Sequence, residues 1–343
     1  MREFNSTMNI RRSRGLSLIE LMVSILLGVI LSSGIIAVYL ESKRNYAAEE
    51  EMARIQENGR FALELLKREL SMAGFFGGYF VAEDSMNGES LTGGGEECVA
   101  TGEWALDVTT PLEVINNFNN SWVTNTPTTL AGCVPTNSWV KAGSDVLTVK
   151  RTSAKPTMFE GLLVDGAKAR DSQYYLKVEQ YGDTKEWFYD PSVADDFAAD
   201  PNDVEEYWEM YAKIFYIRNW SVAVGDGVPA LCVRELIQNE MATTDRCLVE
   251  GIEDMQIEFG VDSNADDVPN TYTPDPNDMN QVVTARIYLL VRSLGELVST
   301  ENANTKTYQL GLDSGVVTTA NDGYMRQMFS TTVLVRNAIL PAS

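Results

Sequence analysis

The feature that most constrains this chain is an apolar run near its N-terminus, from Leu16 to Leu40, whose single charged residue is Glu20. About 20 apolar residues in a helix cross the hydrocarbon of a bilayer, so this run is long enough to span a membrane. Arg11, Arg12 and Arg14 come just before it, and such positive charge stays on the cytoplasmic side. The sequence therefore predicts a single-pass membrane anchor with a cytoplasmic N-terminus and a body outside the cytoplasm.

Glu20 is the unusual residue of this run. A carboxylate inside a membrane segment is costly, and its presence indicates a function that involves a positively charged partner. Cleavage after Gly15 would create a new α-amino group at Leu16. We therefore expect Glu20 to form an assembly charge pair with the N-terminus of another helix.

The segment around Gly15 resembles the leader of type IV prepilins and pseudopilins, a short basic stretch that ends in glycine and precedes an apolar run with Glu at the fifth mature position. Glu20 is fifth when counted from Leu16. The resemblance implies that a prepilin peptidase cuts between Gly15 and Leu16 and methylates Leu16. Leu16 stands where major pilins usually carry Phe, a difference that minor pilins and pseudopilins tolerate.

Two simpler interpretations explain less of the segment. A general secretory signal peptide needs a shorter apolar core and an A-x-A-like exit site, and neither is found here. A simple membrane anchor would explain the length of the run, but it accounts for neither Gly15 nor Glu20.

The helical pattern continues beyond the apolar run. No proline occurs between Leu16 and Ala73, and apolar residues keep helical spacing, with Phe61 and Leu65 expected to widen the stripe. The stripe consists of Ala48, Met52, Ile55, Ala62, Leu66 and Ala73. One helix from Leu16 to Ala73 would be about 85 Å long, with Gly74 suited to end it.

The helix-ending segment from Arg68 to Gly77 resembles that of the PilW family of minor pilins. The resemblance covers residues 11–80 strongly and the C-terminal strands weakly. It implies an α+β, type IV pilin-like fold, in which a long N-terminal hydrophobic helix packs on an antiparallel sheet with a loop-rich inserted lobe. The expected parts are a leader (1–15), a transmembrane and filament-core half of the helix (16–40), its amphipathic half (41–73), and a globular domain (74–343) with the lobe at about 81–142.

Strand patterns begin after the lobe. Runs rich in β-branched and aromatic residues predict strands at residues 145–151, 173–180, 213–219, 229–236, 255–261, 283–291 and 329–335. Residues 190–210 are interpreted as an acidic insert with a short helix near 204–211.

The four cysteines predict disulfides, because a body outside the cytoplasm favours oxidation. Three connectivities are open, and we prefer Cys98–Cys133 and Cys232–Cys247, the pairs that are adjacent in sequence. Free buried thiols are the alternative.

No catalytic or nucleotide-binding pattern occurs, and histidine, the commonest general base, is absent. We therefore expect no enzyme and no cofactor. Asp262, Asn264 and Asp266 imitate the first half of a calcium loop, but Asp267 and Thr273 depart from it, so a solvated hairpin loop is the alternative. The net charge of −22, near −25 without residues 1–15, disfavours direct binding of nucleic acid.

The resemblance to PilW implies a minor pilin that is held in the inner membrane, with its body in the periplasm, until it joins other minor pilins in a complex at the pilus tip. By the same resemblance, that complex primes assembly of the major pilin and carries an adhesin. A minor pseudopilin of type II secretion, or a tip module with an adhesive or calcium-dependent role, is the alternative.

Overall fold

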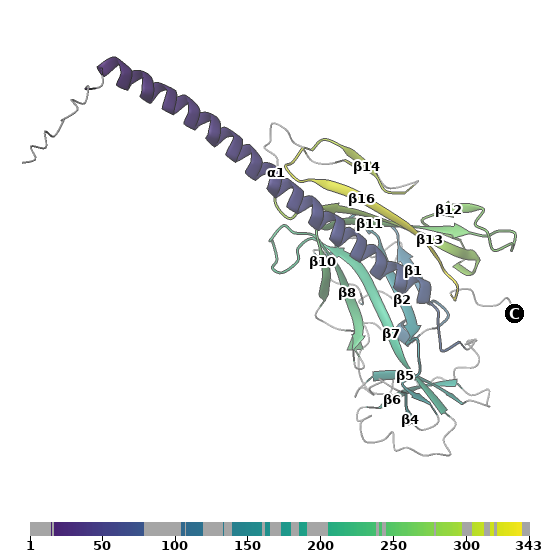
Figure 1. Ribbon diagram of the computed structural model, residues 1–343. Helices are drawn as coiled ribbons and strands as arrows, with labels where there is room; N and C mark the ends of the chain where they lie inside the picture. Colours follow the sequence, from purple (N-terminus) through teal and green to yellow (C-terminus); the bar gives the residue numbers. More distant parts are fainter. Residues whose placement is uncertain are drawn as a thin grey trace, which may run out of the picture. The chain divides into compact units, whose positions relative to one another are not determined.

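The computed structural model describes residues 15, 17–78, 104–106, 108–118, 133, 139–159, 162–164, 173–179, 185–190, 205–237, 240–241, 245–277, 279–296, 304–311, 316–318 and 321–337. The chain divides into two compact units, residues 1–50 and 51–343. Helix α1 (Leu18–Met72) contributes its first part to one unit and its last part to the other (Figure 1).

The first part of α1 presents its apolar side chains outward. The large apolar side chains between Leu18 and Leu40 are exposed, and Gly28 and Gly34 do not interrupt the helix. By length and composition, this helix is able to cross a membrane.

The last part of α1 has one buried face, formed by residues three or four positions apart. Its members are Ile55, Gly59, Ala62, Leu66, Glu69 and Leu70. The expected contribution of Phe61 is wrong, since its side chain is 56% exposed, whereas Leu65 is partly buried. Phe61 comes two residues after Gly59, about 200° around the helix, so it faces away from the side that the ring of Phe329 covers. On that side, a Cβ added to Gly59 would come within 2.5 Å of the ring.

The helix ends at Met72, and Gly74 follows with a φ of 74°. Glycine adopts this left-handed conformation without a steric penalty, which fits the expected role of Gly74. Its N–H donates to the carbonyl of Lys150, 3.0 Å away, so the turn out of the helix is fixed to a strand.

One sheet of unit 51–343 is built around a long strand, β7 (Glu205–Arg218). Antiparallel pairing gives the order β1-β2-β7, and β8 pairs with the second half of β7. The neighbours are β1 (Leu112–Ile115), β2 (Val146–Thr152) and β8 (Ala230–Ile237), and β10 (Arg246–Glu250) and β9 (Glu240–Met241) pair with β8.

A second antiparallel sheet has the order β12-β11-β13-β16. Its strands are β11 (Ile252–Val261), β12 (Thr271–Thr273), β13 (Val282–Arg292) and β16 (Arg326–Leu334). The register of β11 on β13 aligns Ile257 with Ile287, which gives the two strands a common apolar face. A short helix, η3 (Met279–Gln281), precedes β13, and β14 (Thr307–Gln309) pairs with β15 (Val316–Thr318).

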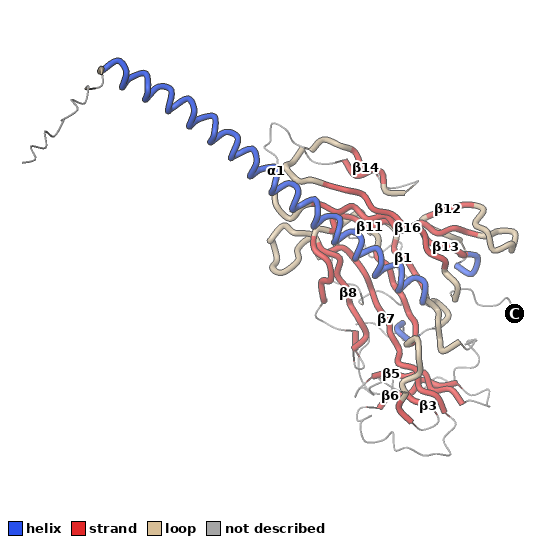
Figure 2. Tube along the Cα trace, viewed as in Figure 1, coloured by secondary structure: helices blue, strands red, loops and turns tan. Residues whose placement is uncertain are grey.

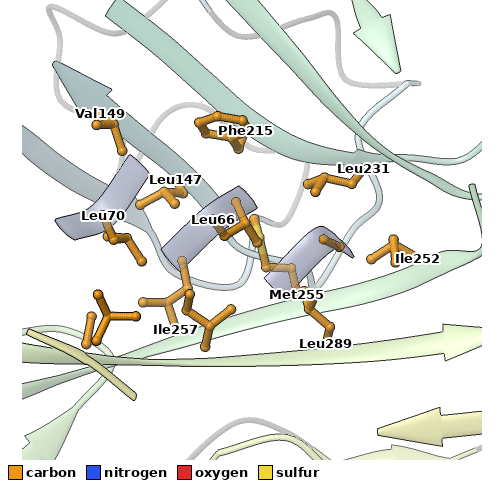
Figure 3. Close-up of a cluster of buried hydrophobic side chains, with 14 of the residues drawn as sticks. Leu66, Leu70, Leu147, Val149, Phe215, Leu231, Ile252, Met255, Ile257 and Leu289 are labelled. Carbon is orange, nitrogen blue, oxygen red and sulfur yellow. The ribbon is translucent and has the colours of Figure 1, made fainter. Parts of the chain in front are cut away.

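The buried face of α1 lies between these two sheets. Figure 3 shows Leu66 and Leu70 with Leu147 and Phe215 on one side and Ile257 on the other. Burying a side chain of this size stabilises the fold by about 1.5–3 kcal/mol. The result is an α+β arrangement consistent with a pilin-like fold, as expected from the sequence.

A second core lies on the other face of the first sheet, where Trp104 of the short helix η2 (Trp104–Leu106) packs near Ile214 and Tyr216. The first half of β7 pairs with β5 (Gln173–Glu179), which in turn pairs with β6 (Lys185–Asp190). It also pairs with β3 (Met158–Phe159), which pairs with β4 (Leu162–Leu163). Figure 2 shows β3, β5 and β6 gathered at the lower end of β7. The short helix expected near 204–211 is therefore wrong. This acidic segment forms a strand because the backbones of β5 and β3 pair with it, and a pairing with distant segments does not show in its own sequence pattern.

Candidate assembly site

The side chain of Glu20 caps the N-terminus of α1. Its carboxylate Oε2 accepts the backbone N–H of Ser17, 3.0 Å away, and the side chain is exposed. Ser17 and Glu20 have the S-x-x-E spacing of a capping box, in which a glutamate satisfies one of the N–H groups that an N-terminus leaves unpaired. This spacing is visible in the sequence, but the sequence prediction did not use it.

The geometry leaves half of the carboxylate available. Oε1 of Glu20 accepts no hydrogen bond from the described residues, and an ionised carboxylate has room for several donors. Gly15 is exposed, and Leu16 lies outside the described residues, so the cleavage and methylation predicted there stay predictions.

The other end of α1 is fixed to the body by a buried ion pair that the sequence did not predict. Glu69 is 1% exposed. Its carboxylate accepts two hydrogen bonds from Arg151 of β2, at 2.7 and 3.1 Å, and one from the Nζ of Lys213 of β7, at 2.9 Å. Charge-assisted pairs with this bidentate geometry are among the strongest hydrogen bonds in proteins.

Electrostatics keep Glu69 ionised. Burial acts to raise the pKa of its carboxyl group, but the hydrogen bonds and charges of Arg151 and Lys213 outweigh it, and the pKa lies below its usual value. Both cations also lie over the ring of Tyr211, at 4.8 and 5.4 Å from its centroid. The last turns of α1 are therefore locked onto the sheet by charge as well as by apolar packing.

A second polar contact joins the two sheets. Asp145, just before β2, accepts backbone N–H groups from Asn117 and from Ile257 of β11, at 2.8 and 2.7 Å. Burial, reinforced by the charges of Asp254 and Glu258, raises the pKa of Asp145 to about 7, although these hydrogen bonds oppose the shift. Proton release from this side chain therefore works against the folded state.

The cysteines agree with the prediction where the structure describes them. Cys232 of β8 and Cys247 of β10 lie opposite one another and form a disulfide, so this pairing is confirmed. Cys133 is buried, but Cys98 lies outside the described residues, and the Cys98–Cys133 pairing stays a prediction.

The loop expected to resemble a calcium site is closed by its own backbone. Both carboxylate oxygens of Asp262 accept N–H groups, from Asn264, Ala265 and Asp267. The Asn264 side chain donates to Asp266. In the parts of the chain that the structure describes, no three acidic or cysteine side chains converge as a metal site would require. The calcium prediction itself stays untested.

Two segments of the chain match models of known protein families. Residues 214–337 match the model of the type IV pilus-assembly protein W, PilW. Residues 10–36, which include Gly15 and Glu20, match the prokaryotic N-terminal methylation motif. The resemblance to prepilins is thus confirmed at the N-terminus. The resemblance to PilW is confirmed as well, but the match lies in the C-terminal strands, where it was expected to be weak, and does not include the helix-ending segment 68–77. No match was found among curated proteins or solved structures.

Proposed function

We propose that this chain, a type IV pilus-related pilin of the PilW family, is a minor pilin that helps prime pilus assembly in a tip complex with other minor pilins. The observation that carries the proposal is the start of α1, where Glu20 opens a long run of exposed apolar residues. Such a surface needs either lipid or other apolar helices around it, and a subunit that passes from a membrane into a filament meets both.

The carboxylate geometry suggests how a subunit would be recognised. After cleavage at Leu16 the chain would keep Ser17, so Oε2 of Glu20 continues to cap its own helix. Oε1 would then accept a hydrogen bond from the methylated, positively charged amino group of a neighbouring subunit. In a medium of low dielectric constant this charge pair is stronger than in water.

Two substitutions of Glu20 separate charge pairing from capping. Glu20→Gln keeps an oxygen that can accept the Ser17 N–H but removes the charge, and Glu20→Ala removes both. Glu41→Gln, which neutralises an exposed glutamate just after the apolar run, serves as the matched control. Each variant is tested for its mature N-terminus by mass spectrometry and for its amount in sheared filaments by immunoblotting.

We expect every variant to begin at methylated Leu16 and only the two Glu20 variants to be depleted from filaments. Recovery of Glu20→Gln at the level of the native chain would show that capping suffices and would refute the charge pair. A chain that still begins at Met1 would remove the pilin mechanism altogether.

Deletion of the chain tests the priming role. Loss of pili supports assembly, whereas piliated but non-adherent cells support a tip module that binds a surface through an adhesin. Intact pili with defective protein secretion would instead indicate a pseudopilin.

A further inference from the structure

The loop between β7 and β8, residues 219–229, exposes two large apolar side chains. Val222 is 82% and Val224 is 74% exposed. The loop contains a single charged residue, Asp226. Isolated exposed valines are common on proteins, so the question is how this tip is held and what lies next to it.

The tip is rigidly built, because Asp226 ties the loop to itself. Its carboxylate accepts backbone N–H groups from Ser221, Val222, Ala223 and Val228. The slight desolvation of Asp226 acts to raise the pKa of its carboxyl group, but these hydrogen bonds lower that pKa to about 2. The only charge of the loop is therefore directed at its own backbone, and the two valines are held outward at little further entropic cost.

The base of the loop is equally fixed. The ring of Trp220 packs edge-on against Trp139 at 5.5 Å and lies under the guanidinium of Arg218 at 3.4 Å. Arg292, the last residue of β13, donates to the carbonyl of Gly227. This contact fixes the loop to the second sheet as well as to the first.

These contacts set the loop at the end of the body where α1 enters it. The backbone N–H of Leu294, two residues after Arg292, donates to the carboxylate of Glu51, the first residue of the second unit. On the other side Ser221 donates to Glu250, whose carbonyl accepts the side-chain amide of Asn58. The loop and the first turns of the docked helix thus share one cluster of hydrogen bonds.

The short connection between the apolar run and the body keeps this end of the body close to the membrane. The apolar run ends at Leu40, eleven residues before Glu51, and eleven helical residues measure about 16 Å. Whatever the angle between the units, this end of the body stays near the bilayer while the helix spans it.

We propose that residues 221–228 form a membrane-contact loop, which inserts Val222 and Val224 at the bilayer surface while the chain is anchored. The two tryptophans at its base suit this position, since tryptophan is enriched at membrane–water interfaces. The contact steadies the body before assembly and is given up when the subunit is extracted. It is independent of the priming role, because it concerns the anchored state alone.

A fluorescence experiment on the full chain tests the proposal. Val222→Cys and Val224→Cys are each labelled with an environment-sensitive fluorophore, under oxidising conditions that preserve the native disulfide. The chain is reconstituted in vesicles of phosphatidylethanolamine and phosphatidylglycerol, with and without lipids that carry a doxyl quencher on the acyl chain.

Val268→Cys is the matched control, because Val268 is also an exposed valine, 57% accessible, in a loop. That loop follows the far end of β11, whose start is tied to Pro229 through the N–H of Gly251. The length of β11 separates the two loops by about 30 Å. The two sites therefore differ in their place on the body rather than in side-chain type.

We expect doxyl lipids to reduce the emission of labels at 222 and 224 and to leave the label at 268 unchanged. No quenching at 222 and 224 in chains that float with the vesicles would overturn the proposal. Equal quenching at 268 would overturn it too, since the body would then lie on the membrane without preference. A blue shift at 222 that depends on protein density but not on doxyl lipids would assign the loop to contact with a second copy and refute lipid contact.

Discussion

Removal of Glu69 should loosen the attachment of α1 to the body. Glu69→Ala leaves Arg151 and Lys213 facing each other without their shared anion, in a site where their side chains are only 12% and 15% exposed. Breaking a buried ion pair from one side costs about 3–5 kcal/mol. Lys213 keeps Glu235 at 3.7 Å, so we expect the lower end of that range in the free energy of unfolding.

The measurement is urea unfolding of the detergent-solubilised chain, followed by circular dichroism. Glu64→Ala is the control, because Glu64 is an exposed residue of the same helix whose ion pair with Lys67 spans 3.8 Å, and exposed pairs contribute about 0–1 kcal/mol. The pKa of Glu69 lies below its usual value, so its contribution is present above the unfolded pKa and is lost as the pH falls through the folded one. If Glu69→Ala lowers the free energy of unfolding no more than Glu64→Ala does, the ion pairs of Glu69 do not hold α1 on the sheet.

Three further perturbations follow from packing, cross-linking and protonation. Gly59→Ala should lower the free energy of unfolding by about 1–3 kcal/mol, because its methyl group meets the ring of Phe329; unchanged urea midpoints would contradict the close approach. Replacing both Cys232 and Cys247 with Ala should cost about 3 kcal/mol for a loop of this length, and a thermal melt that reducing agent does not shift would argue against it. Asp145 has a pKa raised to about 7, so its stabilising contribution is full below its unfolded pKa near 4 and is lost as the pH rises through about 7. Stability of the native chain should fall over that interval more than that of Asp145→Asn, and parallel profiles would contradict this.

Several features could be predicted from the sequence because they depend on neighbouring residues. The helix follows from the absence of proline and from apolar spacing, and its end follows from Gly74, where a left-handed residue is needed. Strands such as β11 and β13 were recognisable because every second residue over most of each strand is apolar, which gives the strand one apolar face. The N-terminal methylation motif, which includes Gly15 and Glu20, is equally local.

Other features depend on contacts between distant segments, and no local pattern reveals them. The first half of β7 has an acidic sequence that becomes a strand only because β5 and β3 pair with it. In the sequence Glu69 looks like an ordinary polar residue of a helix. Its burial is possible because Arg151 and Lys213, on separate strands, form ion pairs with its carboxylate. Phe61 is exposed because the body covers only the face of α1 that includes Leu66 and Leu70, and Phe61 lies outside that face.

The sequence by itself thus determined the apolar run, the long helix and the N-terminal methylation motif, since each is set by the order of residues within a few helical turns. Only the tertiary structure decided which charges are buried together and which apolar residues stay in solvent. Burial is a property of the neighbours that folding brings, and for Glu69 those neighbours come from residues 82 and 144 positions away.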